Sequence, residues 1–490
     1  MAVTTGSESV PRTQAPPARE IERRSIDWVP EEERHGRLWH QAPLWFLGNF
    51  QYFSIPIGFI GPGLGLSLGW SIVAGALGIL VGTLFMAFHA TQGPRLGLPQ
   101  MIQSRAQFGY RGVLVPLFAT LFTYVAFNVA DQVLMSQGLH AAFGWSAGLV
   151  AVVIAVLAAI IAIWGHDWVH RVFRLILVFS LPIVSILSVG VLLGLAGGHS
   201  SGGHLGFTMA AFMAQFSAAA AYNITYAPYV SDYSRYLPGD TPARRVIGSV
   251  FFGAAASPIW LIALGAWLAI RLGATDGLLG TKLAGNNIFH PLGSVSAILL
   301  AAGLAATMGM NAYGGMLSVL TGIDSIRPIR PTRRARIVTI VVLTVVWYVI
   351  AESISSSAVN TVLNSLTLML YLLVPWTATN LVDFFLVRRG HYAIADLFTP
   401  RGIYGPWGWR GLTAYFAGFL AEIPFMVLPD LAGFKYTGPV AKQISGVDIS
   451  WLVGLVVSGG AYWLLSRSLN LGAEEAAIAV SDEQLAAVGK

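Results

Sequence analysis

The chain has 490 residues, of which 55% are hydrophobic and only 11% are charged, and it contains no cysteine. Soluble domains carry roughly 25% charged residues, and a single core stops growing near about 250–300 residues, so a soluble protein with one large core is excluded. The net charge of +6 comes without a clustered basic stripe, which argues against nucleic acid as a partner, and without cysteine there are no disulfides or thiolate metal sites.

Residues 1–37 are polar and charged and contain several prolines. They lack the apolar core of a signal peptide. We expect this segment to be a mostly disordered cytoplasmic tail, followed by a short surface helix near Trp39. At the other end, residues 468–490 are predicted to form a second cytoplasmic tail, so that one membrane domain occupies residues 38–467.

Within this domain, apolar runs are separated by polar residues or by glycine and proline. A helix needs roughly 20 apolar residues to cross about 30 Å of hydrocarbon. Runs of that length lie near residues 43–68, 70–90, 113–142, 145–165, 171–196, 207–230, 246–272, 294–321, 336–354, 359–387, 411–430 and 449–467. The sequence therefore predicts an all-α integral membrane protein with twelve transmembrane helices.

The positive charges are distributed unevenly between the two sides of this arrangement. Cytoplasmic loops of membrane proteins carry an excess of Lys and Arg. Of the 29 Lys and Arg residues, all but Arg271, Lys282, Lys435 and Lys442 fall in the two tails or around the loops that follow even-numbered spans. The alternation predicts a multi-pass protein of the plasma membrane with both termini in the cytoplasm.

The first five spans, about 43–196, and the next five, about 207–387, begin on opposite sides of the membrane. This is the arrangement of inverted repeats, in which the first helix of each repeat is often broken near the bilayer midplane. Proline removes a backbone donor and clashes with the preceding turn. Pro56, followed by Gly58, and Pro228 lie at corresponding places in the two repeats, and we predict helix breaks there.

Polar and aromatic side chains precede each predicted break. Gln51 and Ser54 come before the first break, and Asn223 and Tyr226 come before the second. A substrate site between the two breaks would use these side chains together with freed backbone groups. The alternative is structural, since prolines are tolerated in transmembrane helices whose neighbours satisfy the freed carbonyls.

The third and eighth spans also carry polar residues at membrane depth. Tyr124, Asn128 and Asp131 follow one another at helical spacings of three and four, so they share one face. An aromatic ring and a carboxamide suit a flat heterocycle, because the ring stacks and the amide both donates and accepts. Thr307 and Asn311 lie one turn apart in the eighth span. The alternative for these residues is hydrogen bonding between helices.

Asp131 is the most costly of these side chains to bury in a membrane. Ionisable groups at this depth often relay protons. Asp131 is therefore a candidate proton carrier, and the competing interpretation is a structural partner for an amide or backbone group.

Two loops resemble a known family. The segment from Gly93 to Gly112, GPRLGLPQMIQSRAQFGYRG, closely resembles the loop between the second and third spans of the nucleobase–cation symporter family. Ser231 to Pro238, SDYSRYLP, looks like the signature that follows the sixth span of that family. The family includes purine–cytosine permeases and hydantoin and allantoin transporters, and the resemblance extends over about residues 38–467.

The resemblance implies a leucine-transporter-like fold, with a 5+5 inverted repeat plus two extra helices, that works by alternating access. Members hold a heterocyclic base between aromatic rings of the third and sixth spans, with amide contacts from the third and eighth. Here these roles fall on Tyr124 and Asn128, then on Asn223 or Tyr226, and then on Asn311. The usual third-span aromatic is tryptophan, and the tyrosine of this chain leaves the choice of base open.

The coupling ion is also suggested by the resemblance. Sodium-coupled relatives bind the ion with backbone carbonyls of the broken first span and with side-chain oxygens of the eighth. Hard cations need several oxygen ligands. In this chain Thr307 supplies one, whereas Gly303, Ala305 and Ala306 supply none. A depleted site favours a proton as the co-transported ion, with Asp131 as its carrier, and sodium is the alternative.

The predicted function is therefore secondary active uptake of a nucleobase or related nitrogen heterocycle by cation symport, with the base and the lipid bilayer as partners. No cofactor and no obligate protein partner is expected. A sodium-coupled transporter of hydantoin, allantoin or a vitamin-type heterocycle is the alternative within this class. A channel or an intramembrane enzyme is the alternative from a different class, but the histidines lie mostly near loops or helix ends, which is a poor arrangement for catalysis at depth.

Overall fold

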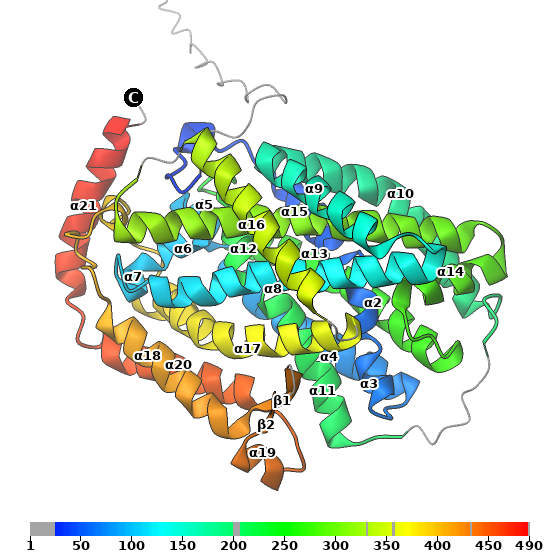
Figure 1. The fold of residues 1–490 in the computed structure, drawn as a ribbon. Helices are drawn as coiled ribbons and strands as arrows, with labels where there is room; N and C mark the ends of the chain where they lie inside the picture. Colours follow the sequence, from blue (N-terminus) through cyan, green and yellow to red (C-terminus); the bar gives the residue numbers. More distant parts are fainter. Residues whose placement is uncertain (1–24, 199–205, 330–331, 355–357, 432–433, 489–490) are drawn as a thin grey trace, which may run out of the picture.

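The computed structural model of the chain describes residues 25–198, 206–329, 332–354, 358–431 and 434–488. Most of these residues lie in helices, and Figure 1 shows the longest of them running side by side in one bundle.

The first half of the bundle contains α1 (Gln41–Asn49), α2 (Ser54–Ile57), α3 (Ile60–Gly63), α4 (Leu68–His89), α5 (Gln92–Leu96), α6 (Gln100–Gln103), α7 (Arg105–Phe108), α8 (Leu114–Phe143), α9 (Ala147–Trp164) and α10 (His166–Leu192). The second half contains α11 (Met209–Ile224), α12 (Ala227–Ser234), α13 (Ala243–Arg271), α14 (Gly277–Ile288), α15 (Leu292–Ile326), α16 (Arg333–Ser353), α17 (Ala358–Val382) and the π-helix η3 (Asp383–Val387). The remaining elements are α18 (Trp409–Glu422), β1 (Val427–Leu431), β2 (Phe434–Thr437), α19 (Pro439–Gln443), α20 (Ser450–Ser466) and α21 (Leu471–Val488), with 3-10 turns η1 (Glu31–Glu33), η2 (Leu38–His40), η4 (Ala395–Phe398) and η5 (Ile423–Phe425).

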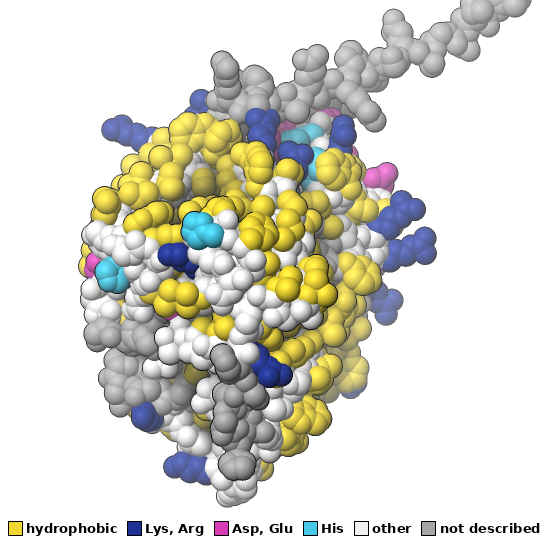
Figure 2. Space-filling model, turned by 90° about the vertical axis from the view of Figure 1, so that its right-hand side faces the viewer, with side chains coloured by type: hydrophobic (Ala, Val, Ile, Leu, Met, Phe, Trp, Pro, Cys, Tyr) yellow, Lys and Arg dark blue, Asp and Glu magenta, His cyan; other side chains and the backbone are white. Residues whose placement is uncertain are grey.

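Each of the twelve predicted spans coincides with a helix or with consecutive helices. Within the described part of the chain, eight helical segments are long and apolar enough to cross a membrane by length and composition alone. The predicted spans outside this group are the first and sixth, which are divided, and the last two, whose helices are shorter. Large hydrophobic side chains are exposed along the long helices, for example Val152, Val156 and Ile160 of α9, as expected of a surface that faces lipid. Figure 2 looks along the helices onto one end of the bundle, where hydrophobic side chains lie among polar ones. The chain is an all-α multi-pass membrane protein.

The first and sixth spans are each divided into separate helices. In the first span, residues 50–53 separate α1 from α2, and Pro56 is the third residue of α2. In the sixth span, Thr225 and Tyr226 separate α11 from α12, and Pro228 is the second residue of α12. A proline early in a helix costs no hydrogen bond, since the amides of the first turn lack partners within the helix.

Close packing of α4 on α11 joins the two halves of the chain. A Cβ atom built on Gly78 would lie 2.2 Å from the carbonyl oxygen of Phe216, and one on Gly82 would lie 2.2 Å from that of Ala220. Only glycine allows the two backbones to approach this closely. The second span therefore contacts the first half of the sixth span directly.

The N-terminal segment differs from the expected disordered tail in its described part. The backbone amide of Val29 donates to the carbonyl of Gly97 (2.9 Å), and the Arg34 guanidinium donates to the carbonyl of Pro94 (2.8 Å). Ile26 and Val29 are buried. The prediction was wrong for residues 25–37, because these hydrogen bonds hold the segment against the loop after α4. Residues 1–24 lie outside the described residues.

The C-terminal part differs from expectation in two places. The eleventh span, predicted to reach residue 430, leaves the α-helix after Glu422, because Pro424 follows and a β-hairpin of β1 and β2 begins at Val427. The segment after the last span, predicted as a tail, forms α21, which is bent by 89° from α20. Figure 1 shows α21 lying across one end of the bundle.

Candidate substrate-binding site

Polar side chains of α8 and α15 meet in the interior of the bundle. The Asn311 side-chain amide donates to Oδ1 of Asn128 (2.8 Å) and to Oδ2 of Asp131 (3.3 Å). The Asn128 amide donates to the carbonyl of Met308 (3.2 Å). All three side chains are buried. Among the described residues, Oδ1 of Asn311 has no hydrogen-bond partner, so the group retains a buried acceptor that a bound molecule could satisfy.

Tyr124 lies one turn before Asn128 and contacts the second half of the divided sixth span. Its ring meets the ring of Tyr229 edge to face, with centroids 4.3 Å apart. Its hydroxyl donates to the carbonyl of Pro228 (3.3 Å). A Cβ atom on Gly314 would lie 2.5 Å from the Tyr124 ring. The ring therefore occupies space that glycine leaves open on α15.

Further aromatic rings surround the two helix breaks. Tyr226 lies parallel to Phe127 of α8, with centroids 5.8 Å apart and an interplanar angle of 21°. Tyr222 lies parallel to Phe53 of the first span, with centroids 5.3 Å apart and an angle of 16°. Flat faces of this kind are suited to stacking on a planar ring. The predicted site residues did not include Phe53, Phe127, Tyr222 or Tyr229, although each is an aromatic residue next to a predicted break or on the predicted face.

Gln51 and Ser54 connect the first break to the sixth span. The Tyr222 hydroxyl accepts hydrogen bonds from the Gln51 amide (2.8 Å) and the Ser54 hydroxyl (3.3 Å). The Tyr226 hydroxyl donates to the carbonyl of Gly48 (3.2 Å). The carbonyl of Gly48 near the end of α1 is thus held by a side chain from the other repeat, and the two breaks lie side by side.

Asn223 and Thr307 are not directed toward this group. The Asn223 amide donates to Thr83 (2.5 Å) and to the carbonyl of Ala254 (3.0 Å), and its oxygen accepts from Asn49 (2.9 Å). These partners lie on α4, α13 and α1. The Thr307 hydroxyl donates to the carbonyl of Gly303 on its own helix (3.1 Å). Of the two sixth-span alternatives, the structure therefore brings Tyr226, and not Asn223, next to the third span.

Near the first break, α15 carries a glycine instead of a polar side chain. A Cβ atom on Gly303 would lie 3.0 Å from the Gln51 side chain and 3.4 Å from the carbonyl oxygen of Phe50. Gly303, which lies close to this carbonyl, supplies no side-chain oxygen.

Gly58 follows the first break and packs against α13. A Cβ atom at this position would lie 2.2 Å from the carbonyl oxygen of Ile262. On the other helix, a Cβ atom on Gly265 would lie 2.0 Å from the carbonyl oxygen of Ile55. The backbones of α2 and α13 thus approach each other through glycines on both sides.

The two loop segments that suggested a family lie in contact at one end of the bundle. The backbone amide of Gln100 donates to the Asp232 carboxylate (2.9 Å). Arg105 is buried and forms an ion pair with Asp324 at the end of α15 (2.8 Å). The Tyr110 hydroxyl donates to the carbonyl of Asp324 (2.9 Å), and burial raises the pKa of Tyr110 to about 12, so the hydroxyl keeps its proton at physiological pH.

Sequence comparison finds a family and several relatives that match most of this chain. Residues 28–454 match the family described as permease for cytosine/purines, uracil, thiamine, allantoin. YxlA of Bacillus subtilis, provisionally named a purine-cytosine permease, is 34% identical over 91% of this chain and 96% of its own. The purine-cytosine permease fcyB of Emericella nidulans is 23% identical over 91% of this chain and 88% of its own.

A solved structure shares the fold. MHP1, a nucleobase-cation-symport-1 family transporter in a closed conformation with bromovinylhydantoin bound, superimposes with a TM-score of 0.69 at 17% identity, covering 91% of this chain and 96% of its own. The predicted leucine-transporter-like repeat fold is thereby confirmed. The chain therefore belongs to the nucleobase–cation symporter family of transporters.

Proposed function

We propose that this protein takes up a nucleobase or related nitrogen heterocycle across the plasma membrane by cation symport with alternating access. The observation that carries the proposal is the buried carboxamide pair of Asn128 and Asn311, with an acceptor oxygen on Asn311 that has no partner among the described residues. Asn128 lies on the same helix, α8, as the rings of Tyr124 and Phe127. Family membership and relatives named for purine and cytosine transport support the same substrate class.

In this proposal the base stacks on the aromatic rings and is held at its edge by the amides. Tyr124, Phe127 and Tyr226 offer ring faces, and Asn128 and Asn311 offer both donors and acceptors. Nucleobase edges present both kinds of group. Because these side chains are buried against each other, the base enters only when the bundle opens, as alternating access requires.

We assign Gln51 and Ser54 a structural role at the first helix break rather than direct contact with the base. Both hydrogen-bond the Tyr222 hydroxyl, so they set the position of a ring that faces the site. Asn223 is assigned a similar supporting role, since its amide is occupied by Thr83 and Ala254. Pro56, Gly58 and Pro228 shape the helix breaks.

We propose a proton as the coupling ion, with Asp131 as its carrier. Asp131 is buried and accepts a hydrogen bond from the Asn311 amide, so protonation would change a contact of the substrate site directly. A sodium site at the first break would need several oxygen ligands. Gly303 supplies none there, and the Thr307 hydroxyl is bonded to its own helix. Sodium-coupled transport of a hydantoin, allantoin or vitamin-type ring is the alternative.

Uptake by purified protein in sealed vesicles tests the proposal. Radiolabelled cytosine, adenine, hypoxanthine, uracil, allantoin, a hydantoin and pyridoxine are each offered with a proton gradient, a sodium gradient or no gradient. We expect one base to accumulate with the proton gradient and to compete with its chemical neighbours. Transport that is unchanged when every gradient is collapsed would contradict symport, and accumulation with the sodium gradient alone would favour the alternative.

A further inference from the structure

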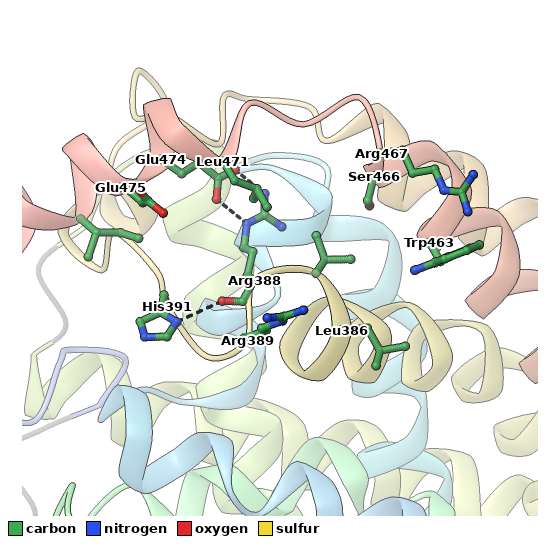
Figure 3. Close-up of a pocket in the computed structure, with 12 residues that line it drawn as sticks. Leu386, Arg388, Arg389, His391, Trp463, Ser466, Arg467, Leu471, Glu474 and Glu475 are labelled. Atoms are coloured by element: carbon green, nitrogen blue, oxygen red, sulfur yellow. Dashed lines mark hydrogen bonds and ion pairs between the residues drawn. The ribbon is translucent and has the colours of Figure 1, made fainter.

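A cavity lies at the end of the bundle, away from the substrate site. It has a volume of about 620 Å³ and opens between η3, the last turn of α20 and the first turns of α21. Figure 3 shows the side chains that line it, with Arg388, Arg389, Arg467 and Glu474 coming from three different elements. None of these residues takes part in the proposed transport site.

Part of the charge in this cavity is used to hold α21 in place. Arg388 pairs with Asp383 (2.5 Å) and binds the Glu474 carboxylate through Nε and Nη2, both at 2.7 Å. It also donates to the Tyr462 hydroxyl (3.2 Å). Such bidentate hydrogen bonds fix the relative geometry of the guanidinium and the carboxylate. Arg388 and Glu474 therefore form a wall of the cavity, and their charges are already paired.

Two further arginines are not paired in this way. Neither Arg389 nor Arg467 forms an ion pair within the described residues. Besides Glu474, which is bound to Arg388, the cavity lining contains one other carboxylate, that of Glu475. Arg389 has a φ of +51°, a left-handed backbone conformation that residues other than glycine and asparagine rarely adopt. Strain of this kind persists where the surroundings fix it, commonly at ligand sites. The Arg467 guanidinium lies 4.1 Å from the Trp463 ring centre.

The rim of the cavity is apolar and exposed. Leu386 is 59% exposed, Trp463 43% and Leu471 41%. Tryptophan next to basic residues at the end of a membrane helix is typical of the headgroup level of the bilayer. If α20 spans the bilayer as the sequence predicts, the 89° bend between the two helices directs α21 along the membrane surface. Side chains of α21 line one side of the cavity.

We propose that this cavity binds the headgroup of an anionic phospholipid. The phosphodiester contacts the guanidinium groups of Arg389 and Arg467, which both line the cavity, since such groups match phosphate oxygens in geometry and charge. The acyl chains extend over Leu386 and Trp463 onto the exposed side of α20. A free phosphate ion would share the arginine contacts but would make no use of the apolar rim.

Lipid binding to the purified full-length chain tests the proposal. Native mass spectrometry and thermal unfolding in detergent are recorded with dioleoylphosphatidylglycerol, dioleoylphosphatidylcholine or inorganic phosphate. The test variant combines Arg389→Gly with Arg467→Ala, because glycine adopts a positive φ freely and should leave the fold intact. The matched control is Arg244→Ala with Arg245→Ala, two exposed arginines at the start of α13.

We expect phosphatidylglycerol to bind more tightly than phosphatidylcholine and to raise the melting temperature, and inorganic phosphate to have little effect. The test variant should bind phosphatidylglycerol about thirtyfold more weakly, which is the contribution of two arginines near an anionic headgroup, and the control should bind as the wild type does. Equal binding by wild type and test variant would overturn the proposal. An equal shift with inorganic phosphate would show that a free anion is the ligand.

Discussion

At the scale of single residues, the centre of the bundle contains two carboxamides and a carboxylic acid that are hydrogen-bonded to one another. Asn311 donates to both Asn128 and Asp131, which leaves its own oxygen without a described partner. A buried polar atom without a partner costs about 1–3 kcal/mol. A ligand that donates to this oxygen would recover that free energy, so the arrangement favours a bound base over a site filled only by side chains.

Replacing Asn128 with Ala should abolish or strongly reduce uptake while leaving the protein in the membrane. The variant loses a donor and an acceptor at the base edge and leaves a polar atom of the base unpaired, which corresponds to a loss of about ten- to hundredfold in binding. Initial uptake rates in vesicles, normalised to the amount of inserted protein, measure the effect. Asn287→Ala on α14 is the control and should transport normally. Unchanged kinetics in Asn128→Ala would remove Asn128 from the site.

Replacing Asp131 with Asn should separate binding from accumulation. Asparagine keeps the size of the side chain and an oxygen that accepts from Asn311 but cannot carry a proton. We therefore expect the variant to bind or exchange the base without accumulating it against a gradient. Counterflow and proton-driven uptake, measured on the same vesicles, distinguish the two activities. If proton-driven accumulation persists, the carrier lies elsewhere.

The sequence identified part of this group and missed the rest for a physical reason. Spacings of three and four placed Tyr124, Asn128 and Asp131 on one face, and polar atoms at membrane depth are conspicuous. Phe127 and Tyr222 were missed because an aromatic ring in an apolar helix is equally suited to lipid. Asn223 was a poor candidate because α11 ends at Ile224 and a new helix begins at Ala227, so helical spacing does not show which residues on the two sides of the break share a face.

At the scale of elements, the divided first span depends on close contact with α13. Replacing Gly58 with Ala places a methyl group 2.2 Å from the Ile262 carbonyl oxygen, a backbone atom that cannot move without displacing the helix. Overpacking of this kind costs about 1–3 kcal/mol. We expect a lower melting temperature and slower uptake for Gly58→Ala.

Gly63→Ala is the matched control for this prediction. Gly63 ends α3, is exposed, and a Cβ atom there would meet no atom within 4 Å. The control should melt and transport as the wild type does. If Gly58→Ala behaves in the same way as Gly63→Ala, the contact between α2 and α13 is not the tight one described.

Hydropathy located the membrane helices well but could not predict the elements around them. The length of an apolar run reports burial in lipid, and all twelve predicted runs overlap helices, although the eleventh also covers part of β1. By contrast, α21 and residues 25–37 are held by specific partners far away in the sequence, such as Arg388 for Glu474 and Gly97 for Val29. Composition carries no information on such partners, so both segments were expected to be tails.

At the scale of the whole molecule, the loops that mark the family connect the two repeats at one end of the bundle. Arg105 lies in the loop before α8, and Asp324 ends α15 in the other repeat. Removing one partner of a buried ion pair leaves an unpaired charge and costs about 3–5 kcal/mol. Arg105→Ala should therefore lower the melting temperature of the purified protein markedly.

Arg111→Ala is the control for Arg105→Ala, because Arg111 belongs to the same loop but is exposed. It should change the melting temperature little, since exposed charges contribute little to stability. Equal melting temperatures for the two variants would show that the buried ion pair does not hold the repeats together.

The orientation of the whole molecule in the membrane can be tested on one helix. The chain has no cysteine, so a single introduced cysteine is the only thiol that can react. Arg244 and Arg271 are exposed near opposite ends of α13, a helix of 29 residues, which at about 1.5 Å per residue is longer than the hydrocarbon layer. The distribution of Lys and Arg predicts that Arg244 faces the cytoplasm. We expect Arg271→Cys to react with a membrane-impermeant maleimide added to intact cells, and Arg244→Cys to react only after permeabilisation, with the wild type as the unlabelled control. The reverse pattern would invert the proposed orientation, and labelling of both variants in intact cells would show that α13 does not span the membrane.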